Sequence, residues 1–131
     1  MVSPEYGGDG NTPAEPGKYK DPLIGFPGHW APDDLIFYTG TQFPAKYRGG
    51  MFVALHGSWN RSQRQGYKLA YIPFKNGMAT AGPEDFLSGF MLAADKKEVW
   101  GRPVGLLQMP DGSLLVTDDG GRKIWRVSYK G

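Results

Sequence analysis

This sequence contains no cysteine among its 131 residues. It therefore has no disulfide framework and no thiolate nucleophile, and the absence fits an oxidising or a reducing compartment equally well. A charge excess of one sign is also lacking, because fifteen Lys and Arg residues against thirteen Asp and Glu residues give a net charge of +2. So small a charge does not build the basic field on which nucleic-acid binding depends, and we expect no nucleic-acid partner.

Long hydrophobic runs are missing as well. No apolar run approaches the roughly 20 residues that a membrane-spanning helix needs. Residues 1–22 lack the hydrophobic core of a signal peptide. We therefore expect no membrane association, and the sequence carries no targeting signal of its own.

Turn-forming and aromatic residues are abundant, with 20 Gly, 11 Pro and an aromatic share of 14%. This composition favours many short strands joined by tight turns over a helical bundle. Residues 1–28 are rich in Gly and Pro without a sustained hydrophobic period, so we interpret them as an extended leader or a long loop. The remaining chain contains seven predicted strands, at residues 34–40, 50–57, 67–74, 85–92, 104–109, 113–119 and 123–129.

The hydrophobic patterns of these strands predict how deeply each is buried. Residues 50–57 and 113–119 hold nearly continuous apolar runs, which are typical of strands buried on both faces. Residues 67–74 and 123–129 alternate with a period of about two, which predicts one buried face. The Pro-Asp-Gly sequence at 110–112 predicts a tight hairpin turn in which the glycine takes a positive φ.

The seven strands form a run of four followed by a similar run that stops at three. Four antiparallel strands in roughly 40–60 residues are the size of a β-propeller blade, and a last blade short of one strand is commonly closed by a strand from elsewhere in the ring. The predicted fold class is therefore all-β with about two four-stranded antiparallel blades. Residues 29–99 would form the first blade and residues 100–131 the second, incomplete one. A seven-stranded sandwich is the structural alternative.

Two blades cannot form a propeller alone. A ring needs about four to eight blades because each blade is covered only by its neighbours. Two isolated blades would leave apolar faces in water. We therefore expect either a homo-oligomer, in which three copies would supply about six blades, or N-terminal blades that are missing from this sequence.

Several segments occur together at a characteristic spacing: PGHWAPDDLIFYTGTQFPAKYRGGMFVALHGSWNR, GYKLAYIPF, DFLSGF and GRPVGLLQMPDGSLLVTDDGGRKIWRVSY. Together they resemble the C-terminal part of the pyrroloquinoline quinone (PQQ)-dependent glucose/sorbosone dehydrogenase family, from about residue 22 to the end. The resemblance implies a six-bladed β-propeller with PQQ over its central axis. It also implies hydride transfer from a sugar to PQQ, and a periplasmic or secreted location.

The resemblance implies cofactor contacts at five residues. The loop FPGHWAP places His29 and Trp30 beside the cofactor, and Arg102 in GRPVG is expected to pair with its carboxylates. In HGSWNR, His56 or Arg61 is expected to lie against the quinone. These residue types suit the ligand, because PQQ is a flat tricarboxylate that needs cations and a planar surface.

Part of the family pattern is absent. The family's general base is a histidine in an earlier blade, and its calcium site also comes from blades that this sequence lacks. No catalytic residue and no metal site are therefore assigned, and PQQ is implied by the resemblance alone. We expect the chain to be inactive by itself. The alternative function is a non-catalytic, homo-oligomeric propeller module that binds a carbohydrate or a protein.

Each candidate residue also has a purely structural interpretation. His56 directly follows a predicted buried strand, where a lone histidine more often bonds to a loop carbonyl. His29 and Trp30 could pack a loop crossing, and Arg61 could be a solvated turn residue. Residues 118–121, Asp-Asp-Gly-Gly, fit a hairpin turn better than a calcium loop. The remaining tryptophans are expected to anchor blade packing; they are Trp59, Trp100 and Trp125.

Overall fold

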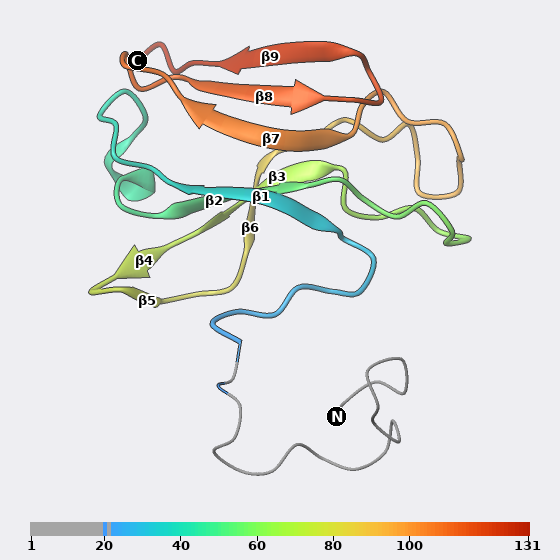
Figure 1. The fold of residues 1–131 in the computed structure, drawn as a ribbon, viewed down its shortest axis with the longest axis horizontal. Helices are drawn as coiled ribbons and strands as arrows, with labels where there is room; N and C mark the ends of the chain where they lie inside the picture. The colour runs from blue at the N-terminus through green and yellow to red at the C-terminus, as the bar shows by residue number, and fades with distance from the viewer. Residues whose placement is uncertain (1–19, 21) are drawn as a thin grey trace.

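The computed structural model describes residue 20 and residues 22–131, which form antiparallel sheets (Figure 1). The first sheet contains, in spatial order, β1 (Pro32–Phe37), β2 (Met51–Leu55), β3 (Lys68–Ile72) and β6 (Glu84–Leu87). The second contains β7 (Pro103–Gln108), β8 (Leu114–Asp118) and β9 (Lys123–Val127). A small hairpin pairs β4 (Phe74–Lys75) with β5 (Met78–Ala79), and η2 (Ala45–Tyr47) is a single 3-10 turn. In the described part of the chain, no helix has the length and apolar character to cross a membrane.

The predicted fold class is confirmed: the chain is all-β, and its two larger sheets are propeller blades of four and three strands. All seven predicted strands are present. The β4–β5 hairpin was not predicted, because residues 67–74 read as one continuous strand. Pro73 has no N–H to continue the ladder, so the chain leaves the first sheet there. Asn76 and Gly77 then take positive φ values of 52° and 77° and close a tight turn.

The two blades repeat one another in register. Pro32 begins the first strand of one blade and Pro103 begins the first strand of the other, and a register shift follows each proline. Lys68 and Lys123 begin the third strands. Each proline and each lysine lies opposite the last residue of the intervening second strand. Lys68 and Lys123 are therefore equivalent positions, whereas β6 has no counterpart in the second blade.

The main core lies between the two blades. Phe52 on β2 lies near its centre, with its ring centroid 4.4 Å from that of Phe86 and 5.7 Å from that of Tyr38. The second blade contributes apolar side chains from β7 and β8. The buried members of this core are Tyr38, Phe43, Phe52, Ala54, Leu69, Tyr71, Leu106, Leu114 and Val116.

Buried hydrogen bonds fix the position of one blade on the other. The Tyr38 hydroxyl donates to the carbonyl of Gly112 at 2.8 Å and accepts from the Phe43 amide at 3.1 Å. The carboxylate of Asp34 accepts from the Leu106 amide at 2.7 Å. Gly112 has a φ of 84°, which confirms the predicted Pro-Asp-Gly turn. A side chain there would also crowd the Tyr38 hydroxyl, since a Cβ would lie 3.0 Å from it.

A second, smaller core covers the outer face of the first blade. Ile24, Phe26 and Trp30 pack on this face together with the β4–β5 hairpin. As a result β3 is buried on both faces from residue 69 to residue 72, and the prediction of one buried face was wrong. The pattern misled because Tyr71 is polar only at its hydroxyl, which donates to the Lys46 carbonyl at 2.5 Å.

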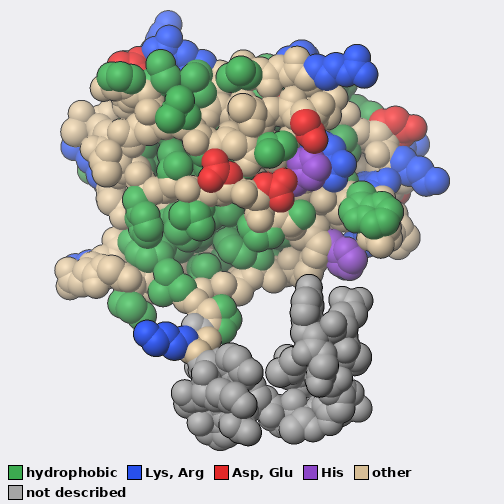
Figure 2. All heavy atoms as spheres, in the orientation of Figure 1, with side chains coloured by type: hydrophobic (Ala, Val, Ile, Leu, Met, Phe, Trp, Pro, Cys, Tyr) green, Lys and Arg blue, Asp and Glu red, His purple; other side chains and the backbone are tan. Residues whose placement is uncertain are grey.

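The outer face of the second blade has no such cover. Thr117 on β8 is exposed and Leu115 is only partly buried, so the prediction that 113–119 is buried on both faces was wrong. Leu107 and Ile124 lie on this same open face and are more than half exposed. In Figure 2, hydrophobic side chains reach the surface over a broad area of the molecule.

The tryptophans were not the blade anchors that the sequence suggested. Trp59 and Trp100 are 74% and 67% exposed, and Trp125 is 40% exposed. Both Trp59 and Trp100 lie in loops rather than strands. Phenylalanine and tyrosine fill the space between the blades instead.

Replacing Phe52 with alanine should lower the free energy of unfolding by about 3–5 kcal/mol, because it removes the ring from the centre of the main core. Urea unfolding of the full chain measures the change. Ile124→Ala, at an exposed position on the open face, should change stability by about 0.5 kcal/mol or less. Equal losses for the two variants would contradict this placement of the core.

Candidate functional site

One end of the two blades carries all five residues implicated by the sequence. Four segments meet there, because the first and third strands of each blade begin, and the second strand ends, at this side. We term this end the His56 edge; it comprises residues 22–31, 56–67, 88–102 and 119–122. The predicted residues on it are His29, Trp30, His56, Arg61 and Arg102. Both histidines are visible at one end of the molecule in Figure 2.

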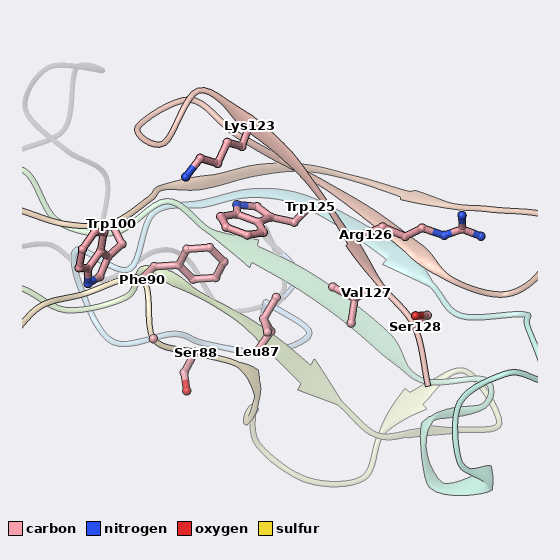
Figure 3. Close-up of a pocket in the computed structure, with 10 residues that line it drawn as sticks. Leu87, Ser88, Phe90, Trp100, Lys123, Trp125, Arg126, Val127 and Ser128 are labelled. Carbon is pink, nitrogen blue, oxygen red and sulfur yellow. The ribbon is translucent and has the colours of Figure 1, made fainter. Parts of the chain in front are cut away.

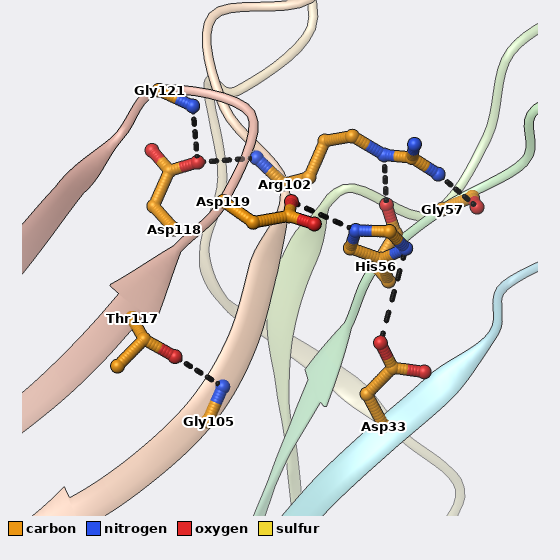
Figure 4. A network of polar contacts seen from close by, with 9 residues as sticks. All are labelled: Asp33, His56, Gly57, Arg102, Gly105, Thr117, Asp118, Asp119 and Gly121. Carbon is orange, nitrogen blue, oxygen red and sulfur yellow. Dashed lines mark hydrogen bonds and ion pairs between the residues drawn. The ribbon is translucent and has the colours of Figure 1, made fainter.

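His56 is held between carboxylates from both blades (Figure 4). Its Nε2 lies 2.9 Å from Oδ1 of Asp119, and its Nδ1 lies 3.8 Å from Oδ2 of Asp33. The purely structural interpretation of His56 predicted a loop carbonyl as the partner of its imidazole. The structure instead places two carboxylates next to it. The sequence did not reveal Asp33 or Asp119 as partners, because they lie on different sheets and no local motif links them to His56.

Arg102 joins the second blade to the loop that follows β2 (Figure 4). Its Nε donates to the carbonyl of His56 and its Nη2 to the carbonyl of Gly57, both at 3.4 Å. Its Cζ lies 5.7 Å from the ring centroid of Tyr67. The guanidinium therefore holds the start and the end of the 56–67 loop together. Its pairing with a cofactor carboxylate stays a prediction.

The 56–67 loop is compact because its two ends nearly touch. A Cβ on Gly57 would lie 2.4 Å from the Tyr67 ring, so only glycine fits beside that ring. Inside the loop, the Ser58 amide donates to the Gln65 carbonyl at 3.0 Å and the Gln65 amide donates to Oγ of Ser58 at 3.1 Å. These two hydrogen bonds give the loop between β2 and β3, which contains several cationic residues, a defined conformation.

Asp118 organises the turn next to this loop. Its Oδ1 accepts from the amides of Arg102 and Gly121, each at 2.7 Å, and its Oδ2 accepts from Nε1 of Trp125 at 2.9 Å. Burial acts to raise the pKa of Asp118, but these hydrogen bonds outweigh it and the pKa lies below its ordinary value. The sequence identified residues 118–121 correctly as a hairpin turn but gave no sign of this role.

A cavity of about 490 Å³ opens at the same edge, lined by His29, Trp30 and Trp59 among others. The Trp30 carbonyl accepts from the Gly57 amide at 3.0 Å, which ties the 22–31 segment to the 56–67 loop. His29 and Ala31 have φ values of 66° and 49°, a conformation that non-glycine residues adopt only where the surroundings impose it. Arg61 is exposed on the loop that carries Trp59.

The His56 edge thus combines cations, aromatic rings and a cavity, without a recognisable metal centre. Among residues 20 and 22–131, no three His, Cys, Asp or Glu side chains lie close enough together to hold a metal ion. The edge therefore places the exposed side chains of Trp59 and Arg61 on a loop that lies next to the carboxylates that hold His56.

Comparison with known proteins identifies the family. The sequence matches the family described as TrAA12-like over residues 9–130. The chain belongs to the TrAA12-like family. This places it beside the PQQ-dependent enzymes that the sequence motifs suggested, but it corrects the finer assignment, since the glucose/sorbosone dehydrogenase family is not the one matched.

Two other proteins are examples of sequences that are similar across most of this TrAA12-like chain. An uncharacterized protein of Borreliella burgdorferi is 43% identical over 114 residues, which are 86% of this chain and 30% of that protein. A "pyrroloquinoline quinone-dependent pyranose dehydrogenase" of Coprinopsis cinerea is 31% identical over 147 residues, covering 89% of this chain and 19% of that protein. This chain therefore spans less than a third of the length of either relative.

Two solved structures have a fold similar to that of this chain. The holo form of the pyranose dehydrogenase PQQ domain from Coprinopsis cinerea superposes with a TM-score of 0.62 at 31% identity, covering 82% of this chain and 29% of that one. The Trichoderma reesei structure of Carbohydrate-Active Enzymes Family AA12 has a TM-score of 0.70 at 23% identity, covering 84% and 27%. The second likeness supports the fold of this TrAA12-like chain.

Replacing Asp118 with asparagine should lower the free energy of unfolding at pH 7 by about 1–3 kcal/mol, because one acceptor oxygen becomes a donor facing donors. The carboxylate stabilises the fold above its unfolded pKa of about 3.9, and this stabilisation is lost as the pH falls through the lower folded pKa. Urea unfolding at pH 7 and pH 3 should therefore show the gap from wild type narrowing in acid. The exposed control Asp95→Asn should show no gap at either pH, and a pH-independent gap for Asp118→Asn would contradict the role.

Proposed function

We propose that this chain forms part of the cofactor-facing surface of a PQQ-dependent sugar oxidoreductase of the pyranose dehydrogenase type. Membership of the TrAA12-like family and the names of its relatives support this substrate class. One observation carries the proposal: the fold brings His29 and Trp59, from two segments that are distant in sequence, into the lining of one cavity. Arg61 is exposed on the same loop as Trp59.

The residues at this edge fit one side of PQQ. The cavity of about 490 Å³ falls in the range usual for small-molecule sites. Trp59 offers an exposed ring for a planar ligand, and Arg61 offers an exposed guanidinium that can bind a carboxylate through two parallel hydrogen bonds. His29 adds a ring nitrogen at the cavity wall. These are the groups that a flat tricarboxylate requires.

His56 and Arg102 act in this proposal as positioning residues. The carboxylates of Asp33 and Asp119 flank His56 and would repel a ligand carboxylate placed against it. Arg102 uses its guanidinium on two backbone carbonyls of the 56–67 loop. Both side chains therefore hold in place the loop that presents Trp59 and Arg61.

The sugar chemistry belongs to an assembly larger than these two blades. Bound PQQ would supply the acceptor for a hydride from the sugar, and a base would be needed to take the hydroxyl proton. His56 contacts two carboxylates, and His29 is placed by this proposal on the surface that faces the cofactor. Neither histidine is assigned as that base. Other blades would supply it, together with the rest of the cofactor site.

The two outward faces support this need for more blades. Leu35 and Phe37 on the first blade and Leu107 and Ile124 on the second are at least half exposed, and the two sets lie on opposite sides of the molecule. Because the blades repeat in register, a further blade placed on the open face of the second blade would take the position that the second blade takes on the first. We propose that additional copies or additional blades of the same polypeptide cover both faces.

A non-catalytic binding module is the second candidate. The exposed rings of Trp59 and Trp100 favour it, because large exposed aromatic side chains often mark binding surfaces. A sugar that binds this chain in the absence of PQQ would support this alternative. The periplasmic or secreted location implied by the sequence resemblance remains a prediction for either candidate.

PQQ added to the full chain should quench tryptophan fluorescence and raise the melting temperature. Arg61→Ala should weaken binding by about 1–3 kcal/mol through loss of a charge-assisted hydrogen bond, and Arg61→Lys should weaken it less. Lys75→Ala, on the β4–β5 hairpin, is the matched control and should bind as wild type does. Absence of any fluorescence or melting change up to millimolar PQQ would refute the proposal.

The solution mass of the full chain should exceed 14.4 kDa, because apolar side chains that remain exposed on the two outer faces would be buried when copies associate. Light scattering over a range of concentrations measures it. Ile124→Glu should shift the mass toward one chain, whereas Lys97→Glu, at an exposed position in the 88–102 segment, should leave it unchanged. A stable single chain at all concentrations would contradict association through these faces.

A further inference from the structure

A polar cavity of about 340 Å³ lies at the His56 edge, next to the cavity that His29 and Trp59 line. Trp30 lines both cavities, so the two are neighbours. The volume falls in the range usual for small-molecule sites. We term this space the Arg64 cavity; the side chains of interest in its lining are Trp30, Arg64, Gln65, Lys68, Asp85 and Ser88.

The Arg64 cavity differs in chemistry from the cavity of about 510 Å³ between the two blades (Figure 3). Aromatic and aliphatic side chains, among them Leu87, Phe90 and Trp125, line the cavity between the blades. In Figure 3, Leu87 and Ser88 point to opposite sides of the chain that carries them. Ser88 also lines the Arg64 cavity, where it joins polar and charged groups. A hydrophilic ligand therefore finds its partners in the Arg64 cavity.

Arg64 has hydrogen-bonding capacity that the surrounding residues do not use. Its Nη1 donates to the carbonyl of Ser58 at 3.0 Å. Its Nε is covered by neighbouring atoms and has no hydrogen-bond partner among residue 20 and residues 22–131. Covered donors without an acceptor are rare in folded proteins, and a bound anion is one of the groups that satisfy them. A rotation of the guanidinium would turn this donor toward an acceptor in the cavity.

Lys68 brings a second cation to the same cavity. Its Nζ lies 4.2 Å from the centroid of the Trp30 ring and 2.5 Å from Oδ1 of Asp85. An ammonium group has three donors, so Lys68 can bind Asp85 and a ligand at the same time. The charged residues that line the cavity are two cations and one carboxylate, and this excess of positive charge favours an anionic ligand.

The cavity also offers groups that bind hydroxyls. Asp85 has a side chain that is 60% exposed, so its carboxylate can accept hydrogen bonds from a ligand. Ser88 contributes a hydroxyl. The side-chain amide of Gln65 donates to the Gly28 carbonyl, which leaves its Oε1 as an acceptor. A carboxylate that also carries several hydroxyl groups therefore fits this cavity better than a bare carboxylate does.

We propose that the Arg64 cavity binds a carboxylated sugar, that is, a uronate unit. The carboxylate lies against Arg64 and Lys68, and the hydroxyl groups lie against Asp85, Gln65 and Ser88. Binding of the uronate needs only residues of this chain. Its further role, as one unit of an acidic saccharide substrate, rests on the proposed function, because the Arg64 cavity shares Trp30 with the cofactor-side cavity.

The first test compares three small molecules on the full chain in the absence of PQQ. D-Glucuronate should bind saturably by calorimetry and should shift the amide NMR signals of residues 64–68 and 85–89 more than those of β8. Glucose, which lacks the carboxylate, should bind at least about tenfold more weakly. Acetate, which lacks the hydroxyls, should also bind at least about tenfold more weakly.

The second test changes the protein. Arg64→Ala should weaken glucuronate binding about tenfold, and Arg64→Lys should weaken it less because the charge remains. Lys75→Ala is the matched control, since it removes a cation on the β4–β5 hairpin and should bind glucuronate as wild type does. The comparison of the three molecules uses the unaltered chain, so it decides the proposal even where Arg64→Ala disturbs the 56–67 loop.

Three results would overturn the proposal. One is no saturable binding at tens of millimolar glucuronate, and another is equal weakening by Arg64→Ala and Lys75→Ala. The third is equal affinity for glucuronate and acetate, which would show a site for any small anion and not for a sugar. Failure of PQQ to bind is a separate result, because it would refute the proposed function and leave glucuronate binding at the Arg64 cavity standing.

Discussion

The packing of one sheet on the next is the interaction on which the rest of this structure depends. Phe52 and its aromatic neighbours on the first blade meet Leu106, Leu114 and Val116 on the second. Apolar burial of this kind is the main favourable term in folding. Here it joins two sheets whose contacting residues are far apart in sequence. Once the faces are together, the buried bonds of Tyr38 and Asp34 fix how one blade sits on the other. The ends of the strands then align, and their loops meet at the His56 edge.

Polar contacts at that edge hold the loops in fixed positions relative to the sheets. Asp118, at the end of β8, accepts hydrogen bonds from the Arg102 amide and from the neighbouring turn. The Arg102 side chain bonds to the carbonyls of His56 and Gly57, and His56 contacts Asp119. The links of Arg102 with His56 and Gly57, and of His56 with Asp119, cross between elements that are far apart in sequence. A loop held in this way can present exposed groups such as Trp59 and Arg61 at defined positions, which a ligand site requires.

The two blades form one interface with each other, and each blade also has an outer face that no other blade covers. Each blade has an inner face covered by its neighbour and an outer face that needs another sheet. The outer face of the first blade is partly covered by residues 24–30 and the β4–β5 hairpin, whereas that of the second is open. The third strands begin with equivalent lysines, and among residues 22–131 only Lys68 has an acidic partner on a fourth strand. Surface and charge are therefore both left unpaired on the second blade, which is consistent with a unit that functions beside other protein.

The sequence by itself determined where the strands and tight turns lie, because alternation, proline and glycine act through the backbone over a few residues. It also pointed to His29, Trp30, His56, Arg61 and Arg102, although by resemblance and not by geometry. Only the tertiary structure decided how deeply β3 and β8 are buried, since burial depends on what covers the far face of a sheet. It alone brought Asp33 and Asp119 to His56 and placed Trp59 in solvent. The physical reason is that these contacts join separate sheets, and no local pattern records which side chains will meet after the sheets have packed.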